Sequence, residues 1–514
     1  MASAVTDPTR LRLWLVPLRR APCALVCAPA VRATFTASQG HADTCGGCMA
    51  RTARQILNAL SGQRTVHIRS TGELVTHVDS AAAAIDRQRR EKGQEAVRRK
   101  PDLRPVIQAE CGRSIDLPPW HVLHAVARGY VLAGQGMGRG LAEHWLSLKY
   151  CEALYGNRAG AMDLTDKGRT PERWYKAMQA RELAVGFGLA AAEHIVRHRY
   201  PDHVVSVVDT STILRAGWAL GGAQRDKGSR PRPDYLIEAW KPGEPSKVTF
   251  VVCRGNHQKP TKRSGRTRST TIQQLVKGTE LAEGMQIGPW NTTPCLLLST
   301  ELMGQGAIVV NALQSPGEAL LPPRIPGVPG NADEEIKDKA GIPYPNAIRI
   351  PALDGHRARN ADGFQVGEDN LGWFGQLLAR TGAAGLTAFA GGGRSTAQYL
   401  TTRQGREHYD VPTFAATSSH HDAEITVGGT KFVGTDHVFR MKTVRIEAFS
   451  GIDSRLYELL KNGRVEEYRK AVYELRSTRR NAHAAQNWNG PISFHDDGTV
   501  MALSILPIRR KRPI

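Results

Sequence analysis

The middle of the chain contains two short stretches with the alternation of apolar and polar positions that is typical of β-strands. The first opens at Pro233-Asp234, and the second follows a Pro/Gly turn and ends at Gly255. One face of the second stretch carries Val248, Phe250, Val252 and Arg254. Because successive side chains of a strand point to opposite faces, the pattern predicts two adjacent strands, with the Asp234 carboxylate at the start of one and the Arg254 cation at the end of its neighbour.

The segments around this pair predict two helices and a further strand. Residues 171–199 have the longest helical pattern, and Thr170-Pro171-Glu172 supplies a capping residue, a proline at the first helical position and an acidic first turn. Residues 203–209 are rich in β-branched side chains, which favours a strand, and a second helix is expected near 271–283. The predicted fold class of residues 161–312 is therefore α/β, with a mixed sheet flanked by helices.

The rest of the chain predicts additional α+β regions on both sides of this core. A length of 514 residues allows two to four domains. We expect a cysteine-containing region at 1–79, a mostly helical region at 80–160, a Pro/Gly-rich linker at 313–345 and a C-terminal α+β domain at 346–514. Within the first of these regions, Thr71-Gly72 predicts the turn of a small hairpin over residues 66–78.

The chain is strongly basic, with 69 Lys and Arg residues against 48 Asp and Glu residues and a formal net charge of +21. This imbalance favours an acidic partner, with nucleic acid first, most readily DNA, and an anionic surface second; a coding bias toward Arg is the alternative explanation. Basic residues concentrate between Pro245 and Thr279, where no acidic residue occurs. The predicted contacts to nucleic-acid phosphates follow the second central strand and are Lys259, Lys262, Arg263, Arg266 and Arg268.

Composition also bears on the compartment. No apolar run reaches the roughly 18–20 residues needed to cross a membrane, and Arg and Pro interrupt the apolar N-terminal patches in a way that a secretory signal would not. Eight cysteines in 514 residues are too few for a disulfide scaffold. We therefore expect a cytoplasmic protein that has no membrane partner.

Four of the cysteines form two pairs near the N-terminus. Cys23 and Cys27 precede Cys45 and Cys48, and the second pair is a CxxC motif. Thiolates in two such pairs are typical ligands of structural Zn²⁺, while buried free thiols are the alternative. A zinc-stabilised interaction protein is thus one candidate class.

Several residues of the central segment match a known pattern at the expected order. These are Glu182 or Glu193 on the first helix, Arg232-Pro233-Asp234-Tyr235-Leu236, Val252-Cys253-Arg254-Gly255, and Gln273 and Gln274 at the start of the next helix. The arrangement resembles the PD-(D/E)XK restriction-endonuclease-like superfamily. That superfamily has an αβββαβ core with an acid on the first helix, Asp on the second strand, (D/E)-x-Lys on the third and often Gln on the following helix. The resemblance covers residues 171–283.

The resemblance implies Mg²⁺-dependent hydrolysis of DNA phosphodiesters. Asp234 would ligate the metal, and Glu182, Glu193 or Glu238 would supply a second carboxylate. Glu182 and Glu193 lie 11 residues apart and share one helix face, and Glu238 lies two alternations beyond Asp234 on its strand. The implied catalytic set is completed by Arg254 in the cationic role and by Gln273 or Gln274 orienting water or backbone.

The third-strand motif departs from the family pattern at two positions. Val252 stands where the second metal-binding carboxylate is expected, and valine cannot ligate Mg²⁺. Arg254 replaces the usual Lys, and Arg stays protonated, so it can stabilise a phosphate but cannot act as a base. For the nuclease-like core, two functions therefore remain open beside the zinc-stabilised class: a metal-dependent DNA endonuclease, and a catalytically degenerate DNA-binding component of a defence or DNA-processing assembly.

Overall fold

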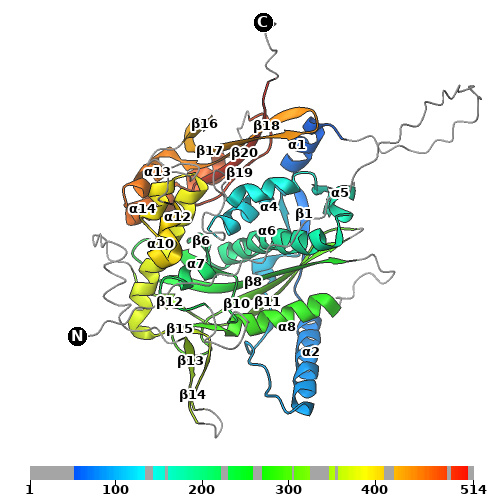
Figure 1. Cartoon of the computed structure of the whole chain (residues 1–514), viewed down its shortest axis with the longest axis vertical. Coiled ribbons are helices and arrows are strands. Elements are labelled where there is room, and N and C mark those ends of the chain that lie inside the picture. The colour runs from blue at the N-terminus through cyan, green and yellow to red at the C-terminus, as the bar shows by residue number, and fades with distance from the viewer. Residues whose placement is uncertain are drawn as a thin grey trace, which may run out of the picture. The chain divides into compact units, whose positions relative to one another are not determined.

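The structure, a computed structural model, describes residues 51–132, 143–156, 160–220, 230–258, 269–303, 306–323, 346–352, 357–409, 422–482 and 488–507. Within these ranges the largest feature is a nine-stranded mixed sheet with helices on both faces (Figure 1). Its strands are β1 (Arg64–Arg69), β2 (Arg104–Pro105), β3 (Ser114–Leu117), β6 (Val204–Asp209), β7 (Tyr235–Trp240), β8 (Ser246–Gln258), β10 (Cys295–Met303), β11 (Val309–Ser315) and β12 (Leu320–Leu321). The main path runs β3-β1-β11-β10-β8-β7-β6, while β12 pairs with β8 and β2 with β11.

The half of the sheet that carries the predicted strands is built as a meander followed by a crossover. β6 pairs antiparallel with β7, and β7 pairs antiparallel with β8. β8 and β10 are parallel, with Arg254 opposite Ser299, and a parallel pair needs a long connection. The helix α8 (Ser269–Glu283) lies within that connection and packs on both strands.

β8 is buried on both faces, which explains its nearly continuous apolar sequence. Cys253 belongs to the core on the side of α6 (Arg173–Arg199), where a Cβ on Gly188 would lie 2.6 Å from the Cys253 Sγ. Val252 belongs to the core on the side of α8, together with Leu275. The middle of α6 is itself enclosed by the sheet and by α4 (Pro119–Tyr130), so this helix is apolar on most of its sides.

The C-terminal region has a five-stranded antiparallel sheet, coloured orange to red in Figure 1, in the order β16-β17-β18-β20-β19. Its strands are β16 (Ala423–Val427), β17 (Thr430–Met441), β18 (Val444–Asp453), β19 (Ile492–Phe494) and β20 (Thr499–Ile505). Four helices accompany it: α10 (Leu371–Phe389), α11 (Gly393–Ala397), α13 (Ser454–Lys461) and α14 (Val465–Ala482). Side chains of this sheet, including Met501 and Leu503, share one apolar core with Trp120 of α4.

The remaining elements lie around these two sheets. Helices are α1 (Ala53–Ser61), α2 (Gly72–Glu91), α3 (Gln108–Cys111), α5 (Asp166–Arg169), α7 (Thr210–Leu214), α12 (Arg406–Tyr409) and the 3-10 turns η1 (Glu143–Tyr150), η2 (Glu368–Asn370) and η3 (Thr402–Gln404). Strands are β4 (Leu154–Gly156), β5 (Met162–Leu164), β9 (Met285–Ile287), β13 (Ala347–Ile350), β14 (Arg359–Asp362) and β15 (Phe364–Val366). No helix within the described ranges has the length and apolar character needed to cross a bilayer.

The structure confirms the mixed α/β sheet flanked by helices and corrects two local expectations. The predicted cap of the long helix is wrong, because α6 begins at Arg173 and its N-cap is Glu172, which makes no side-chain capping hydrogen bond. The predicted hairpin over residues 66–78 is wrong, because only its first half is a strand, β1. Thr71 is the N-cap of α2, and its hydroxyl accepts a hydrogen bond from the Leu74 backbone N–H at 3.2 Å. A threonine followed by glycine therefore starts a helix here, with Glu73 in the first turn.

Candidate functional site

Asp234 and Arg254 meet where β7 begins and β8 approaches its end. The Arg254 Nη1 donates to Asp234 Oδ2 at 2.7 Å, and the Cys253 backbone N–H donates to the same oxygen at 2.8 Å. Both side chains remain 28% exposed. The pair thus lies at the surface of a cleft rather than inside the core.

Strand pairing fixes the position of Asp234. Its backbone N–H donates to the Val251 carbonyl at 3.0 Å, which extends the β7–β8 ladder by one residue. Its carbonyl accepts from the Thr210 N–H at 3.0 Å, on the side of β6 and α7. The Asp234 backbone is therefore held from both sides, which fixes the direction of its Cα–Cβ bond.

A cavity of about 440 Å³ surrounds this ion pair, and we call it the cationic cleft. Its charged lining residues are Arg181, Arg215, Arg230, Arg232, Arg254, Lys277, Asp209 and Asp234. Among the described residues, six cations therefore face two carboxylates. An excess of positive charge in a recess concentrates field lines and attracts anions.

Hydrogen bonds to neighbouring groups position two of these guanidinium groups. The Arg232 Nε donates to Ser211 Oγ at 3.0 Å, and its Nη1 donates to the Arg230 carbonyl at 3.3 Å. Arg230 in turn donates to the Asn346 carbonyl at 2.7 Å. Neutral acceptors hold these cations without cancelling their charge, so the charge stays available to an anion in the cleft.

The two carboxylates of the cleft are weaker acids than usual. Burial raises the pKa of Asp234, and the attraction of Arg254 offsets only part of this effect. Burial also raises the pKa of Asp209, whose Oδ1 accepts from the Thr212 N–H at 2.7 Å and from its hydroxyl at 2.8 Å as the N-cap of α7. Asp209 is thus engaged in capping, and Asp234 is the carboxylate paired with a cation of the cleft.

The structure does not bring the three expected partner carboxylates to Asp234. Glu182 accepts a hydrogen bond from the Tyr150 hydroxyl and pairs with Lys149 at 2.6 Å, toward η1. Glu238 is buried and forms a two-pronged ion pair with Arg469 of α14, with both N···O distances 3.0 Å. Each of these acids therefore has its own cation elsewhere in the fold.

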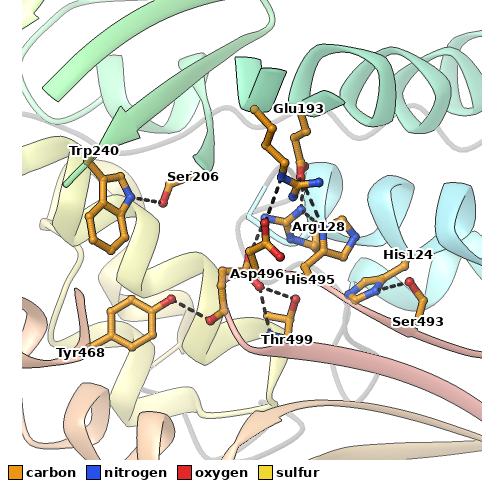
Figure 2. A network of polar contacts seen from close by, with 12 residues as sticks. His124, Arg128, Glu193, Ser206, Trp240, Tyr468, Ser493, His495, Asp496 and Thr499 are labelled. Carbon is orange, nitrogen blue, oxygen red and sulfur yellow. Dashed lines mark hydrogen bonds and ion pairs between the residues drawn. The ribbon is translucent and has the colours of Figure 1, made fainter. Parts of the chain in front are cut away.

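Glu193 lies near the other end of α6 in a buried polar network, which Figure 2 shows. It pairs with Arg128 of α4 at 2.8 Å and with Arg197 at 2.6 Å. Arg128 also reaches Asp497 at 2.5 Å and His495 Nδ1 at 2.9 Å, both in the turn between β19 and β20. The network therefore joins α4 and α6 to the C-terminal sheet, and sequence reasoning missed it because its members come from three distant segments.

The two glutamines of α8 lie apart from the cationic cleft. Gln273 is exposed. Gln274 donates to the Gly255 carbonyl at 2.8 Å and accepts from Asn256 and Ser299 at 2.7 and 2.8 Å. Gln274 thus ties the end of β8 to β10.

The basic residues Lys259, Lys262, Arg263, Arg266 and Arg268 lie outside the described residues, as do Cys23, Cys27, Cys45 and Cys48.

The groups around Asp234 suit an anion better than a divalent cation. Mg²⁺ prefers an octahedron of oxygen ligands that includes carboxylates, whereas the charges that act on the Asp234 carboxylate include the cations Arg254, Arg181 and Arg232. Val252 lies one alternation before Arg254, at the position expected for a carboxylate. Within the described ranges, no cluster of three or more His, Cys, Asp or Glu side chains is arranged to hold a metal ion.

Sequence reasoning found the central ion pair but missed most of the cations around it. Arg181 directly precedes Glu182, so a search of the first helix for acids passed over it. Arg215 follows α7, and Arg230 lies just upstream of the Pro233-Asp234 motif. The available signal was the basic composition of the residues around the motif.

Comparison with protein-family models, curated proteins and solved structures gives no match for this chain.

Proposed function

We propose that this protein binds nucleic acid, most readily duplex DNA, by placing backbone phosphates in the cationic cleft. The observation that carries the proposal is the gathering of six cations around the Asp234–Arg254 pair. Fixed guanidinium groups match the geometry of phosphate oxygens, and neutralised phosphates release counterions that favour binding.

The resemblance to the PD-(D/E)XK superfamily supports this reading of the cleft. Apart from the short insertions α7 and β9, the order α6, β6, β7, β8, α8, β10 agrees with the αβββαβ order that the resemblance implies. Asp234 begins the second of its three meander strands and Arg254 is on the third. On the first helix, however, Arg181 lines the cleft where an acid is expected. This core is inferred to be a nuclease-like core in which Val252 and Arg181 stand where carboxylates are expected, which leaves phosphate binding without hydrolysis.

Metal-dependent hydrolysis is the second candidate, and the exposure of Asp234 favours it. Its side chain is 28% exposed at the cleft, and the two hydrogen bonds described above both use Oδ2. Mg²⁺, if bound there, would polarise a phosphodiester as a Lewis acid.

One assay separates the two candidates. A fluorescein-labelled duplex is titrated with purified protein, and the same duplex is incubated with protein and Mg²⁺ or Mn²⁺ to follow cleavage. The non-hydrolytic proposal predicts binding, an intact duplex, and tighter binding by Asp234→Asn because this variant removes a negative charge. Cleavage by the wild type that Asp234→Asn abolishes would instead establish the hydrolase.

The contact residues are tested on the exposed side of the cleft. Arg181 and Lys277 are exposed, so their replacement by alanine should leave the fold intact. Arg455, whose side chain is 75% exposed on α13, is a matched control of equal charge. Weaker binding by Arg181→Ala and Lys277→Ala than by Arg455→Ala supports the cleft, and equal weakening by all three refutes it.

A further inference from the structure

A second cavity, of about 620 Å³, lies between the core and the C-terminal sheet, and we call it the aromatic pocket. It is formed by η1 with the residues just after it, the first turns of α6 and the end of β17. Five aromatic side chains line it: Trp145, Tyr150, Tyr175, His437 and Phe439. This density of rings is unusual in a chain of which only 6% is Phe, Trp or Tyr.

Two of the rings form an ordered surface on β17. His437 and Phe439 alternate on the strand, and their rings are nearly parallel, with an angle of 9° and centroids 6.4 Å apart. Trp145 of η1 lies 5.9 Å from the His437 ring. Planar side chains held in this way form a platform on which another flat ring can stack.

The pocket also has acceptors for hydrogen bonds. Gln179 of α6 lines it and is only 2% exposed, and its Oε1 has no hydrogen-bond partner within the described part of the chain. A buried acceptor without a partner is unfavourable, so rotation of the amide toward a donor on a bound molecule would be favourable. Glu143 supplies a second acceptor, and burial raises the pKa of its carboxyl. Acceptors beside a stacking platform suit the edge of a nucleobase that carries an amino group.

Cations stand at the rim of the pocket. They are Lys149, Lys167 and Arg440, of which Lys167 is 63% exposed and pairs with Glu152. With Glu143 and Glu152 also in the lining, the pocket has a formal charge of +1, against +4 for the cationic cleft. The interior is therefore better matched to a base than to a phosphate.

Residues of α6 line both cavities. Tyr175 and Gln179 line the aromatic pocket, whereas Arg181 and Val185 line the cationic cleft. At 100° per residue these two pairs lie on faces about 120° apart. A helix is about 10 Å wide with its side chains. A nucleic-acid strand has a phosphate about every 3.4 Å, so a few nucleotides span this distance.

We propose that the aromatic pocket holds an unpaired nucleobase of a nucleic-acid strand whose backbone occupies the cationic cleft. This inference rests on the proposed function and adds a base-binding site that phosphate contacts do not supply. A strand with an accessible base should therefore bind more tightly than its sugar-phosphate backbone alone.

The test compares two labelled 12-nucleotide DNA strands, one of deoxycytidines and one in which every position is abasic. The proposal predicts that the deoxycytidine strand binds about tenfold more tightly or better, as expected for stacking of one base. Tyr175→Leu and Phe439→Leu keep apolar volume and remove one ring each, and both should bring the two affinities together. Tyr473→Leu, at a partly buried tyrosine of α14, is the matched control and should keep the preference.

The outcomes separate this inference from the proposed function. Binding of the abasic strand that weakens in Arg181→Ala reports on the cationic cleft alone. Equal affinity of the wild type for both strands overturns the aromatic pocket and leaves the cleft intact. A preference for bases that survives both leucine variants, or that is lost in Tyr473→Leu, also overturns it. Failure of both strands to bind overturns the aromatic pocket, whereas failure of the duplex to bind overturns the proposed function.

Discussion

Four histidines lie where α4 and η1 meet the C-terminal sheet, and they should make this protein sensitive to mild acid. His121 and His124 are on α4, and both contact Ser493 Oγ at 3.1 Å. His144 of η1 contacts Ser450 Oγ at 2.7 Å, and His495 follows β19. Burial lowers the pKa of His121 to about 4 and of His144 to about 3, and those of His124 and His495 well below the usual value. The folded protein therefore keeps these rings neutral near neutral pH.

The sign of the effect follows from where the protons bind. In the unfolded chain a histidine takes up a proton near pH 6.5, whereas the folded rings do not until the pH is far lower. Their contribution to stability is present above pH 6.5 and is lost as the pH falls below it. The charges facing the rings include Arg128 and Arg197, which oppose protonation, and Glu193 and Asp496, which favour it only in part.

The magnitude can be worked out for a change from pH 7.5 to 5.5. A histidine with an unfolded pKa of 6.5 that stays neutral when folded loses about 1.4 kcal/mol over this interval. Four such residues together predict a loss of about 5–6 kcal/mol, which is comparable to the whole stability of many domains. His124→Asn retains a polar atom near the Nδ1 position and removes one titrating ring, so this variant should lose only about 4 kcal/mol.

Urea unfolding at both pH values, followed by tryptophan fluorescence and far-UV circular dichroism, measures these losses. The difference between wild type and His124→Asn isolates one histidine, because the other groups titrate in both proteins. A wild-type midpoint that does not fall between pH 7.5 and 5.5 would refute the reasoning. So would an equal fall in the variant.

Three further results are expected. Arg128→Met leaves Glu193 and Asp497 buried without their shared cation, and urea unfolding should show a loss of about 3–5 kcal/mol; a loss under 1 kcal/mol would show that the ion pairs do not hold the C-terminal sheet. Gly255→Ala places a Cβ 2.5 Å from the Ala180 carbonyl oxygen and should lower the free energy of unfolding by about 1–3 kcal/mol. Gly72→Ala is the control and should not lower it, because nothing lies within 4 Å of the added Cβ. Equal melting temperatures of the two variants would contradict the close packing of α6 on β8. Duplex binding should strengthen as the pH falls toward the raised pKa of Asp234, whose protonation removes a negative charge from the cleft, and affinity measured by anisotropy should respond less to pH in Asp234→Asn.

The sequence was sufficient for the centre of the site because its signals are local. Period-two alternation in residues 246–255 and the Pro233-Asp234 start define two strands, and antiparallel neighbours joined by a short turn place Asp234 beside Arg254. The helix expected at 171–199 is α6 at Arg173–Arg199. Its long helical pattern was sufficient to predict it, although the predicted cap at Thr170-Pro171-Glu172 was wrong.

The other parts of the site could not be predicted from the sequence, because the alternation of a strand gives the face on which a residue lies but not its distance from other residues. Alternation assigned Glu238 to the face of Asp234, but four residues of a strand span about 13 Å, and Glu238 pairs instead with Arg469 of the distant α14. The cations of the cleft come from α6, the end of α7 and the segment before β7, and only the folded sheet brings them together. The histidine network likewise joins residues more than 300 positions apart.

The most direct test of phosphate binding in the cationic cleft is the dependence of duplex affinity on salt. Each phosphate contact contributes about 0.9 to the slope of log affinity against log salt. The double variant Arg181→Ala, Lys277→Ala should therefore flatten the wild-type slope by about 1.8, while Arg455→Ala leaves it unchanged. A double variant with the wild-type slope would contradict the account.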